Sequence, residues 1–354
     1  MKQKSQRRSS MVTIKDIALK CGLSIASVSK ALSGKANDIN PKTVEYVKSV
    51  AKEMGYIPNA SARVLKTNHS YSIGVLFEDQ TQSGIQHEYF SAILSAIKDG
   101  CEARGYDITF ISHHIGSRNL TYYEHTRFRN CDGVIIVNAE FTNPEIIFLV
   151  ESGIPTVTID YVFENRSSVV SDNSQGMHDI IEYVSRMGHK RIAFIHGELT
   201  SVTQKRLRGF YHACQKYGIE IREDMIKEGR YHVPKDSALA TQDLLDMPNP
   251  PTCIIYPDDY SLLGGMTVIN KRGLKIPDDI SIVGYDGILL SRLMRPEFTT
   301  YVQDAKGIGI SAAKKVIEII ENPKTSKPEI ITVKGHLQKG STVKDLNQAE
   351  NQTI

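Results

Sequence analysis

Residues 13–32 read TIKDIALKCGLSIASVSKAL, and this stretch decides how the beginning of the chain folds. Thr13 stands three residues before Asp16, which is the spacing of a capping box and predicts that a helix begins here. Gly22 predicts a turn after that helix, and Ser24 is expected to cap a second short helix. Two short helices joined by a glycine-containing turn match the helix-turn-helix plan.

A third helix is predicted by Asn40 as its cap and Pro41 as its first residue, and Gly55 is expected to end it. In a helix-turn-helix, the start of the second helix enters the major groove of DNA. The alternative is a generic three-helix bundle with a solvated basic surface. The residues of this headpiece (12–58) that we predict to contact DNA are Thr13, Lys15, Ser24, Ile25, Ala26, Ser27, Ser29 and Lys30.

Charge is distributed unevenly along the 354-residue chain. Its 43 Lys and Arg against 40 Asp and Glu leave a net charge of only +3. Residues 1–66 nevertheless carry 13 basic and four acidic side chains, a net charge of +9, whereas the rest of the chain carries −6. A basic N-terminal segment on a mildly acidic body indicates a polyanion-binding module attached to a second unit. Residues 1–11 are predicted to be a basic, disordered extension.

Several classes of protein are disfavoured by what the sequence lacks. Five cysteines without C-x-x-C spacing argue against a disulfide framework. We find no secretory signal and no stretch long enough to span a membrane, so the chain is expected to be cytoplasmic. No hydrolase elbow, zinc-protease helix or phosphate loop is present, so we predict no enzyme, no metal and no cofactor. His113, His114 and His125 are interpreted as surface histidines.

Residues 59–70 are predicted to form a hinge helix and linker. The segment should be helical only when docked, since isolated helices below about 12–15 residues are marginal. Arg63, Leu65 and Lys66 fit insertion into a minor groove, where an apolar side chain separates a base step. A plain linker is the alternative.

From Tyr71 onwards, short apolar strands alternate with helical segments, which predicts parallel, doubly wound sheets. The alternation occurs in two sets, so two subdomains are expected within residues 71–340. Ligands bind outside the carboxyl ends of the strands in such folds, and between two lobes that edge becomes a cleft. The predicted boundaries are an N-subdomain of about 71–170 and 302–326, a C-subdomain of about 171–300 and 328–340, and a tail of 341–354.

Charged side chains follow several of the predicted strands. Asp160, the pair Asp258 and Asp259, and Asp286 each follow an apolar run, and Arg206 lies near the start of a helix. Carboxylates, a guanidinium and aromatic faces around one cleft would bind hydroxyl groups and stack on a ring, so a polyol or sugar is the expected ligand. A helix N-cap is the alternative role for at least one of Asp258 and Asp259.

These motifs together resemble the LacI/GalR family of bacterial transcriptional regulators over residues 12–340. The resemblance implies a three-helix headpiece joined to a periplasmic-binding-protein-like core of two doubly wound parallel-sheet subdomains. The matching motifs are VTIKDIA at 12–18, SVSKALS at 27–33, GYIPN at 55–59, ARVLK at 62–66, GHKRIA at 188–193, RLRGF at 206–210 and IVGYD at 282–286.

The resemblance also implies a homodimer on a pseudo-palindromic operator and a small effector, usually a sugar or a nucleoside-like metabolite, in the cleft. Its hinge helices would lie in the minor groove with Leu65 wedged at the central base step. The implied hinge contacts with DNA are Asn59, Ala62, Arg63, Leu65 and Lys66. The implied effector-binding residues are Asp160, Arg206, Asp258 and Asp286, with Glu78, Tyr89, Phe90 and Tyr161 as looser candidates.

The predicted recognition helix departs from the family pattern. Ile25 and Ala26 stand where polar base readers are common, and Lys30 replaces an arginine. Apolar side chains read thymine methyl groups, and a lysine lacks the planar fork that binds guanine. The main prediction is a repressor of a carbohydrate-utilisation operon; a stand-alone sugar-binding protein of transport or chemotaxis is the alternative, and a sugar-metabolising enzyme a third class.

Overall fold

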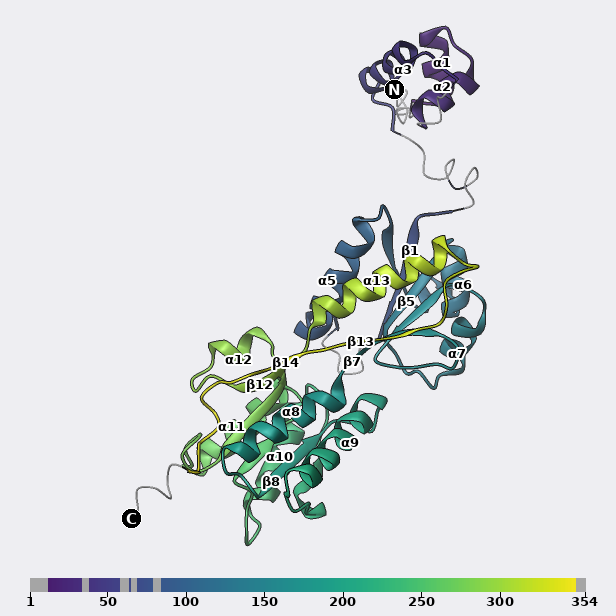
Figure 1. Cartoon of the computed structure of the whole chain (residues 1–354). Coiled ribbons are helices and arrows are strands. Elements are labelled where there is room, and N and C mark those ends of the chain that lie inside the picture. The colour runs from purple at the N-terminus through teal and green to yellow at the C-terminus, as the bar shows by residue number, and fades with distance from the viewer. Residues whose placement is uncertain (1–11, 34–37, 58–63, 65–68, 79–83, 348–354) are drawn as a thin grey trace, which may run out of the picture. The chain divides into compact units, whose positions relative to one another are not determined.

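The computed structural model describes residues 12–33, 38–57, 64, 69–78 and 84–347 (Figure 1). The chain divides into two compact units, and the boundary falls between Ser70 and Tyr71. The predicted N-terminal extension, at residues 1–11, and residues 348–354 of the predicted tail lie outside the described residues. No described helix is long and apolar enough to cross a membrane.

The first unit contains three helices, α1 (Ile14–Cys21), α2 (Ile25–Leu32) and α3 (Pro41–Glu53). Their starts are set by the predicted caps, because the side chains of Thr13, Ser24 and Asn40 accept hydrogen bonds from backbone N–H groups of the first turns. Gly22 ends α1 in the left-handed conformation, with a φ of 64°. The helices enclose a small apolar core of Ile17, Ala18, Val28, Ala31, Val47, Val50 and Ala51.

The second unit alternates strands and helices, as the sequence pattern predicts. Its helices are α5 (Glu88–Glu102), α6 (Tyr122–Phe128), α7 (Pro144–Glu151), α8 (Asn173–Arg186), α9 (Ser201–Lys216), α10 (Pro234–Leu245), α11 (Asp259–Lys271), α12 (Leu289–Leu293) and α13 (Ala305–Glu321), with 3-10 turns η1 (Gly84–Gln86) and η2 (Glu223–Met225). Its strands are β1 (Ser72–Phe77), β2 (Asp107–Ile111), β3 (His114–Ile115), β4 (Arg118–Asn119), β5 (Gly133–Asn138), β6 (Thr156–Ile159), β7 (Ser167–Ser171), β8 (Ile192–His196), β9 (Ile226–Glu228), β10 (Cys253–Ile255), β11 (Ser281–Asp286), β12 (Thr299–Val302), β13 (Ile330–Val333) and β14 (His336–Gln338).

Two six-stranded sheets form the two lobes of this unit. The sheet of the first lobe has the order β13-β7-β6-β5-β1-β2 and is parallel throughout. Its two faces are covered by α5 with α13 and by α6 with α7. The sheet of the second lobe has the order β14-β12-β11-β10-β8-β9, with β14 antiparallel. Helices α8 and α9 cover one of its faces, and α10 and α11 the other.

One predicted subdomain boundary is wrong. Strand β13 lies within residues 328–340, which were predicted to belong to the C-subdomain, yet it pairs in parallel with β7 of the first lobe. Ile330 lies opposite Ser168, and Val333 lies opposite Ser171. The chain therefore crosses between the lobes after β7, between β12 and α13, and again between β13 and β14, and Figure 1 shows the last crossing as a long yellow segment.

The predicted tail begins too early. The backbone oxygen of Thr342 accepts a hydrogen bond from the backbone N–H of Ile282 at 3.0 Å, and Leu346 donates to the backbone oxygen of Met187 at 2.8 Å. Residues 341–347 therefore pack against the second lobe and form part of it.

Candidate DNA-binding surface and ligand cavity

The start of α2 presents a largely apolar surface. Ile25 is 53% exposed and Ala26 is also exposed, whereas Ser24 caps the helix by accepting from the backbone N–H of Ser27 at 3.0 Å. Thr13, Lys15 and Lys30 are exposed, and Ser27 and Ser29 are half-buried. The described headpiece residues predicted to contact DNA therefore combine exposed methyl groups with hydroxyl and ammonium groups.

Two ion pairs in the headpiece were not predicted. Lys30 Nζ lies 2.5 Å from a carboxylate oxygen of Asp38, and Lys20 Nζ lies 2.8 Å from Glu53 Oε1. The Lys30 ammonium lowers the pKa of Asp38. The predicted contact of Lys30 with DNA would require it to exchange this exposed partner for a phosphate or a base. The predicted hinge contacts Asn59, Ala62, Arg63, Leu65 and Lys66 lie outside the described residues.

A cavity of about 680 Å³ is lined by residues of both lobes. Seven predicted effector-binding residues line it: Tyr89, Phe90, Asp160, Tyr161, Arg206, Asp258 and Asp286. Glu78 is not among the described residues around the cavity; its carboxylate accepts a hydrogen bond from the hydroxyl of Tyr122 instead. The strand ends thus deliver most of the predicted polar groups to one place, as a doubly wound fold requires.

Arg206 is the buried cation of the cavity. It lies on α9, and its Nε donates to Asn173 Oδ1 at 2.8 Å while Nη1 donates to the backbone oxygen of Pro257 at 2.7 Å. The guanidinium lies 3.5 Å from the centroid of the Tyr285 ring, and Nη2 lies 3.9 Å from Asp286 Oδ1. Burial alone would lower the pKa of Arg206, but the surrounding tyrosines and Asp286 raise it, so this side chain stays charged.

The carboxylates of Asp160 and Asp286 accept hydrogen bonds from residues that lie where the chain crosses between the lobes. Asp160 Oδ1 accepts from the backbone N–H of Ser171 at 2.7 Å, and Asp286 Oδ1 accepts from Gln303 Nε2 at 2.7 Å. Burial raises the pKa of Asp160, and it raises the pKa of Asp286 to about 6 against the opposing effect of Arg206. Both residues have positive φ angles, 56° for Asp160 and 99° for Asp286, which non-glycine residues seldom adopt.

The pair Asp258 and Asp259 divides into a cavity residue and a structural residue. Asp258 is the N-cap of α11, which confirms the predicted capping role, and its oxygens accept from the backbone N–H groups of Ser261 and His232 at 2.7 and 2.8 Å. Asp259 is buried, and it accepts from the backbone N–H of Gly287 at 2.8 Å. Asp259 therefore fixes the loop that follows Asp286, and burial raises its pKa well above the ordinary value.

Aromatic residues also line the cavity. The rings of Phe141 and Tyr161 are stacked with centroids 4.5 Å apart and an angle of 8° between their planes. Val162 and Leu199 line the same cavity and are 39% and 64% exposed. Phe141, Leu199, Tyr231 and Gln303 were missed by sequence reasoning, because none of them directly follows a strong apolar run.

The histidines follow a different pattern from the predicted one. His113 is half-buried and His114 exposed, but His125 is only 3% exposed and its Nδ1 contacts the backbone of Ser112. The interpretation of His125 as a surface residue is therefore wrong, because α6 turns this side chain inward against the end of β2.

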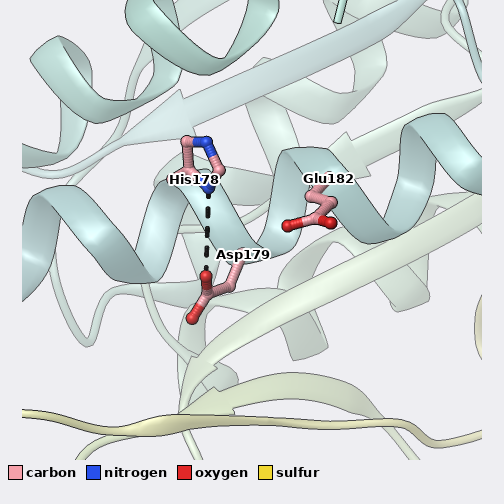
Figure 2. Close-up of side chains that lie close together, drawn as sticks. All are labelled: His178, Asp179 and Glu182. Carbon is pink, nitrogen blue, oxygen red and sulfur yellow. Dashed lines mark ion pairs between the residues drawn. The ribbon is translucent and has the colours of Figure 1, made fainter. Parts of the chain in front are cut away.

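A separate cluster of possible metal ligands lies on α8. Figure 2 shows His178, Asp179 and Glu182 on this one helix, with His178 Nδ1 at 3.9 Å from Asp179 Oδ1. The other ring nitrogen of His178 lies 3.1 Å from Lys216 Nζ. An ammonium group already contacts the imidazole, and all three ligands come from a single helix, so we assign no metal to this cluster.

A helix-turn-helix unit and a two-lobed α/β unit with a polar cavity define a class of protein, the ligand-binding DNA regulators. Comparison with known proteins gives the family. Residues 13–59 match the bacterial regulatory proteins of the lacI family, and residues 181–343 match the periplasmic binding protein-like domain. The chain belongs to the LacI family and is a DNA-binding transcriptional repressor.

Relatives of similar length support this assignment. The chain is 30% identical over 339 residues to the HTH-type transcriptional repressor PurR of Pasteurella multocida, covering 94% of this chain and 99% of the relative. It is 29% identical to the "Probable HTH-type transcriptional repressor ExuR" of Bacillus subtilis, covering 91% and 95%. The lac repressor dimer bound to operator and the anti-inducer ONPF has the same fold, with a TM-score of 0.80, 24% identity and coverage of 95% and 100%. The transcriptional regulator CelR in complex with cellobiose aligns with a TM-score of 0.68, 23% identity and coverage of 94% and 99%.

Proposed function

We propose that this repressor binds a pseudo-palindromic operator as a homodimer, represses a carbohydrate-utilisation operon, and is controlled by a sugar-like effector in the cavity between its lobes. The observation that carries the effector part is the convergence of Asp160, Asp286 and Arg206 from both lobes on one cavity. Such a set of acceptors and a donor fixes the orientation of several hydroxyl groups.

The DNA-binding part of the proposal is supported by the helix-turn-helix of the headpiece and by the similarity of the chain to known repressors. The exposed Ile25 and Ala26 at the start of α2 suit thymine methyl groups, while Lys15 provides a charge for phosphate contacts. Two headpieces in a homodimer would read two half-sites related by twofold symmetry. CelR with cellobiose is an example of a protein of this fold with a sugar in its complex.

The first experiment selects an operator from random DNA with the full chain and measures light scattering to give the mass of the particle. We expect a palindromic consensus and a dimer, and a non-palindromic consensus or a monomeric complex would refute the homodimer.

The second experiment screens neutral sugars by thermal shift, because a ligand that binds only the folded state raises the melting temperature. Asp160→Asn keeps an oxygen for the Ser171 N–H but removes the charge, and it should weaken the response to any sugar that binds. Arg208→Ala, an exposed arginine on the same helix as Arg206, is the control and should respond as the unmodified chain does. An unchanged sugar response in Asp160→Asn would contradict the placement of the effector.

A further inference from the structure

The cavity is lined by two kinds of side chain. The polar ones are Asp160, Asp258, Asp286, Arg206 and Gln303, of which Arg206 is 4%, Asp258 3% and Gln303 7% exposed. The aromatic and aliphatic ones include Phe141, Tyr161, Val162 and Leu199, which are half-buried or exposed. The polar groups can exchange many hydrogen bonds, whereas the others offer ring faces and aliphatic surface. A ligand that uses both must itself have a polar part and a part with a flat or apolar face.

The size of the cavity points the same way. Its volume of about 680 Å³ falls within the roughly 300–1,000 Å³ typical of sites for drug-sized ligands. The stacked rings of Phe141 and Tyr161 line the same cavity as Asp160 and Asp286 and offer a flat surface to a ligand. A cavity of this size has room for a second ring beside a sugar ring.

Charge in the cavity disfavours an anion. Its lining includes five carboxylate residues, Glu140, Asp160, Glu198, Asp258 and Asp286, and two cationic residues, Lys205 and Arg206. The Arg206 guanidinium already donates to Asn173 and Pro257 and lies close to Asp286. A ligand carboxylate or phosphate would meet like charges in a partly desolvated space, where Coulomb repulsion is stronger than in water. Negatively charged ligands should therefore bind more weakly than neutral ones of the same shape.

We propose that the effector is an uncharged glycoside with a second ring, such as a disaccharide or an aryl glycoside, rather than a single sugar or a sugar acid. This inference rests on the proposed sugar-controlled function. The hydroxyl groups of the first ring donate to Asp160 and Asp286 and accept from Arg206, and the second ring stacks against Phe141 and Tyr161. Glu140 and Glu198 add negative potential that disfavours acidic analogues.

Titration calorimetry on the full chain tests the proposal with matched sets of ligands. Each set contains a methyl glycoside, the 4-nitrophenyl glycoside and the 4-nitrophenyl glycosiduronic acid of one hexose, with cellobiose, lactose and maltose alongside. We expect at least one two-ring neutral ligand to bind about tenfold or more tightly than its methyl glycoside. The matching uronic acid should bind at least about tenfold more weakly than the neutral aryl glycoside.

Variants identify the residues responsible. Tyr161→Leu should remove most of the advantage of the second ring, a loss of about two- to tenfold for aryl glycosides and none for methyl glycosides. Phe148→Leu changes an exposed aromatic residue outside the lining and should change neither affinity. The double variant Glu140→Gln with Glu198→Gln should bring the affinity for the uronic acid closer to that for the neutral ligand.

The outcomes separate the two proposals. Equal affinity for methyl and aryl glycosides, or tighter binding of the uronic acid, would overturn this inference and leave a sugar effector in place. If no member of any set binds, both the sugar-controlled function and this inference fail.

Discussion

At the scale of single residues, burying the charged carboxylate of Asp286 in the cavity lowers the stability of the folded state. Asp286 is only 10% exposed, adopts a positive φ, and has a pKa raised to about 6 by burial. Its contacts with Gln303 and Arg206 compensate only part of its desolvation, since the net direction of the pKa shift is upward. Groups with perturbed pKa values cluster at binding sites. Asp286 combines a raised pKa with a place in the cavity lining, whereas the structural Asp259 has a raised pKa but does not line the cavity.

Replacing Asp286 should therefore make the fold more stable at neutral pH. Its pKa is raised above the ordinary value of 3.8 in the folded state, so the protein binds more protons folded than unfolded between about pH 4 and 6, and stability falls as pH rises through that range. Asp286→Asn removes the charge and keeps a carbonyl acceptor for Gln303. At roughly 1.4 kcal/mol per pKa unit, we expect a gain of up to about 3 kcal/mol in the free energy of unfolding at pH 7.5.

Urea unfolding of the full chain at pH 4 and pH 7.5 measures this difference. The gain in Asp286→Asn should be present at pH 7.5 and nearly absent at pH 4, where the native carboxyl is mostly protonated. A variant that is less stable than the unmodified chain at both values would contradict the assigned cost.

Two residues of the headpiece should affect DNA binding in different ways. Lys15 is exposed at the start of α1, and its removal in Lys15→Ala should weaken binding to all sequences and reduce the salt slope by about one.

Ile25→Ala removes apolar surface that suits a thymine methyl group, so it should weaken binding to the selected operator by about tenfold and leave non-specific binding and the salt slope unchanged. Gel shifts at several salt concentrations measure both, and equal losses on operator and random DNA for Ile25→Ala would refute base reading.

At the scale of elements, the sequence predicts best where local chemistry decides. The predicted caps Thr13, Ser24 and Asn40 each start a headpiece helix in the structure. Helix α10 begins with Pro234, but its N-cap Val233 makes no side-chain capping hydrogen bond, so only half of the usual helix-start signal is present in the sequence. Strand β7 is short and rich in serine, and it is buried because β6 and β13 pair with its two edges and helix α13 packs against it. No local pattern encodes that burial.

The same limit applies to the cavity. Asp160 and Asp286 were predictable because they end strands of the two sheets. Gln303 was not, because it reaches the cavity only when the chain crosses between β12 and α13. Glu78 follows β1 as predicted, but Tyr122 on α6 binds its carboxylate, and this contact between elements is invisible in the sequence.

Helix α13 depends on a glycine that resembles a turn residue in the sequence. Gly309 lies inside α13, which packs alongside α5, and a Cβ at this position would lie 2.5 Å from the backbone oxygen of Ile93. Gly307, by contrast, lies in the first turn of α13, and its backbone N–H donates to the carboxylate of the N-cap Asp304 at 2.8 Å. Figure 1 shows the close course of the two helices.

Gly309→Ala should therefore destabilise the first lobe. Overpacking typically costs about 1–3 kcal/mol, and the better helix propensity of alanine offsets up to about 1 kcal/mol, so a net loss of about 1–2 kcal/mol is expected. Thermal unfolding with Lys314→Ala as the control, an exposed position on the same helix, measures it. A Gly309→Ala protein as stable as the control would show that α5 and α13 separate without cost.

At the scale of the whole binding unit, the cavity is coupled to the contacts between the lobes. Ser201 Oγ of the second lobe donates to the backbone oxygen of Asp160 at 2.8 Å, and Glu88 of the first lobe accepts from the backbone N–H of Leu289 at 2.5 Å. Gln303 lies on a crossing and binds both sides: its Nε2 donates to Asp286, and its Oε1 accepts from Ser171 Oγ at 2.5 Å. A ligand that contacts Asp160 and Asp286 therefore acts on the same groups that join the lobes.

Gln303→Ala should loosen the joint between the lobes without unfolding either sheet. The variant loses one hydrogen bond to the carboxylate of Asp286 and two from the hydroxyls of Ser171 and Tyr89, the latter long at 3.5 Å. A bond to a charged group is worth about 1.5–3 kcal/mol and a neutral one about 0.5–1.5 kcal/mol in typical cases. Amide hydrogen exchange in the ligand-free chain should accelerate at the end of β7 and around Gly287, while the headpiece core at Ile17 and Val47 keeps its exchange rate. Gln204→Ala, at an exposed glutamine of the same cavity, is the control.

Because coupling between ligand and DNA typically amounts to about 1–3 kcal/mol, losing this joint should also reduce the change in operator affinity that an effector causes. Exchange that rises equally in both variants, or an unchanged effector response in Gln303→Ala, would place the coupling elsewhere in the lobes.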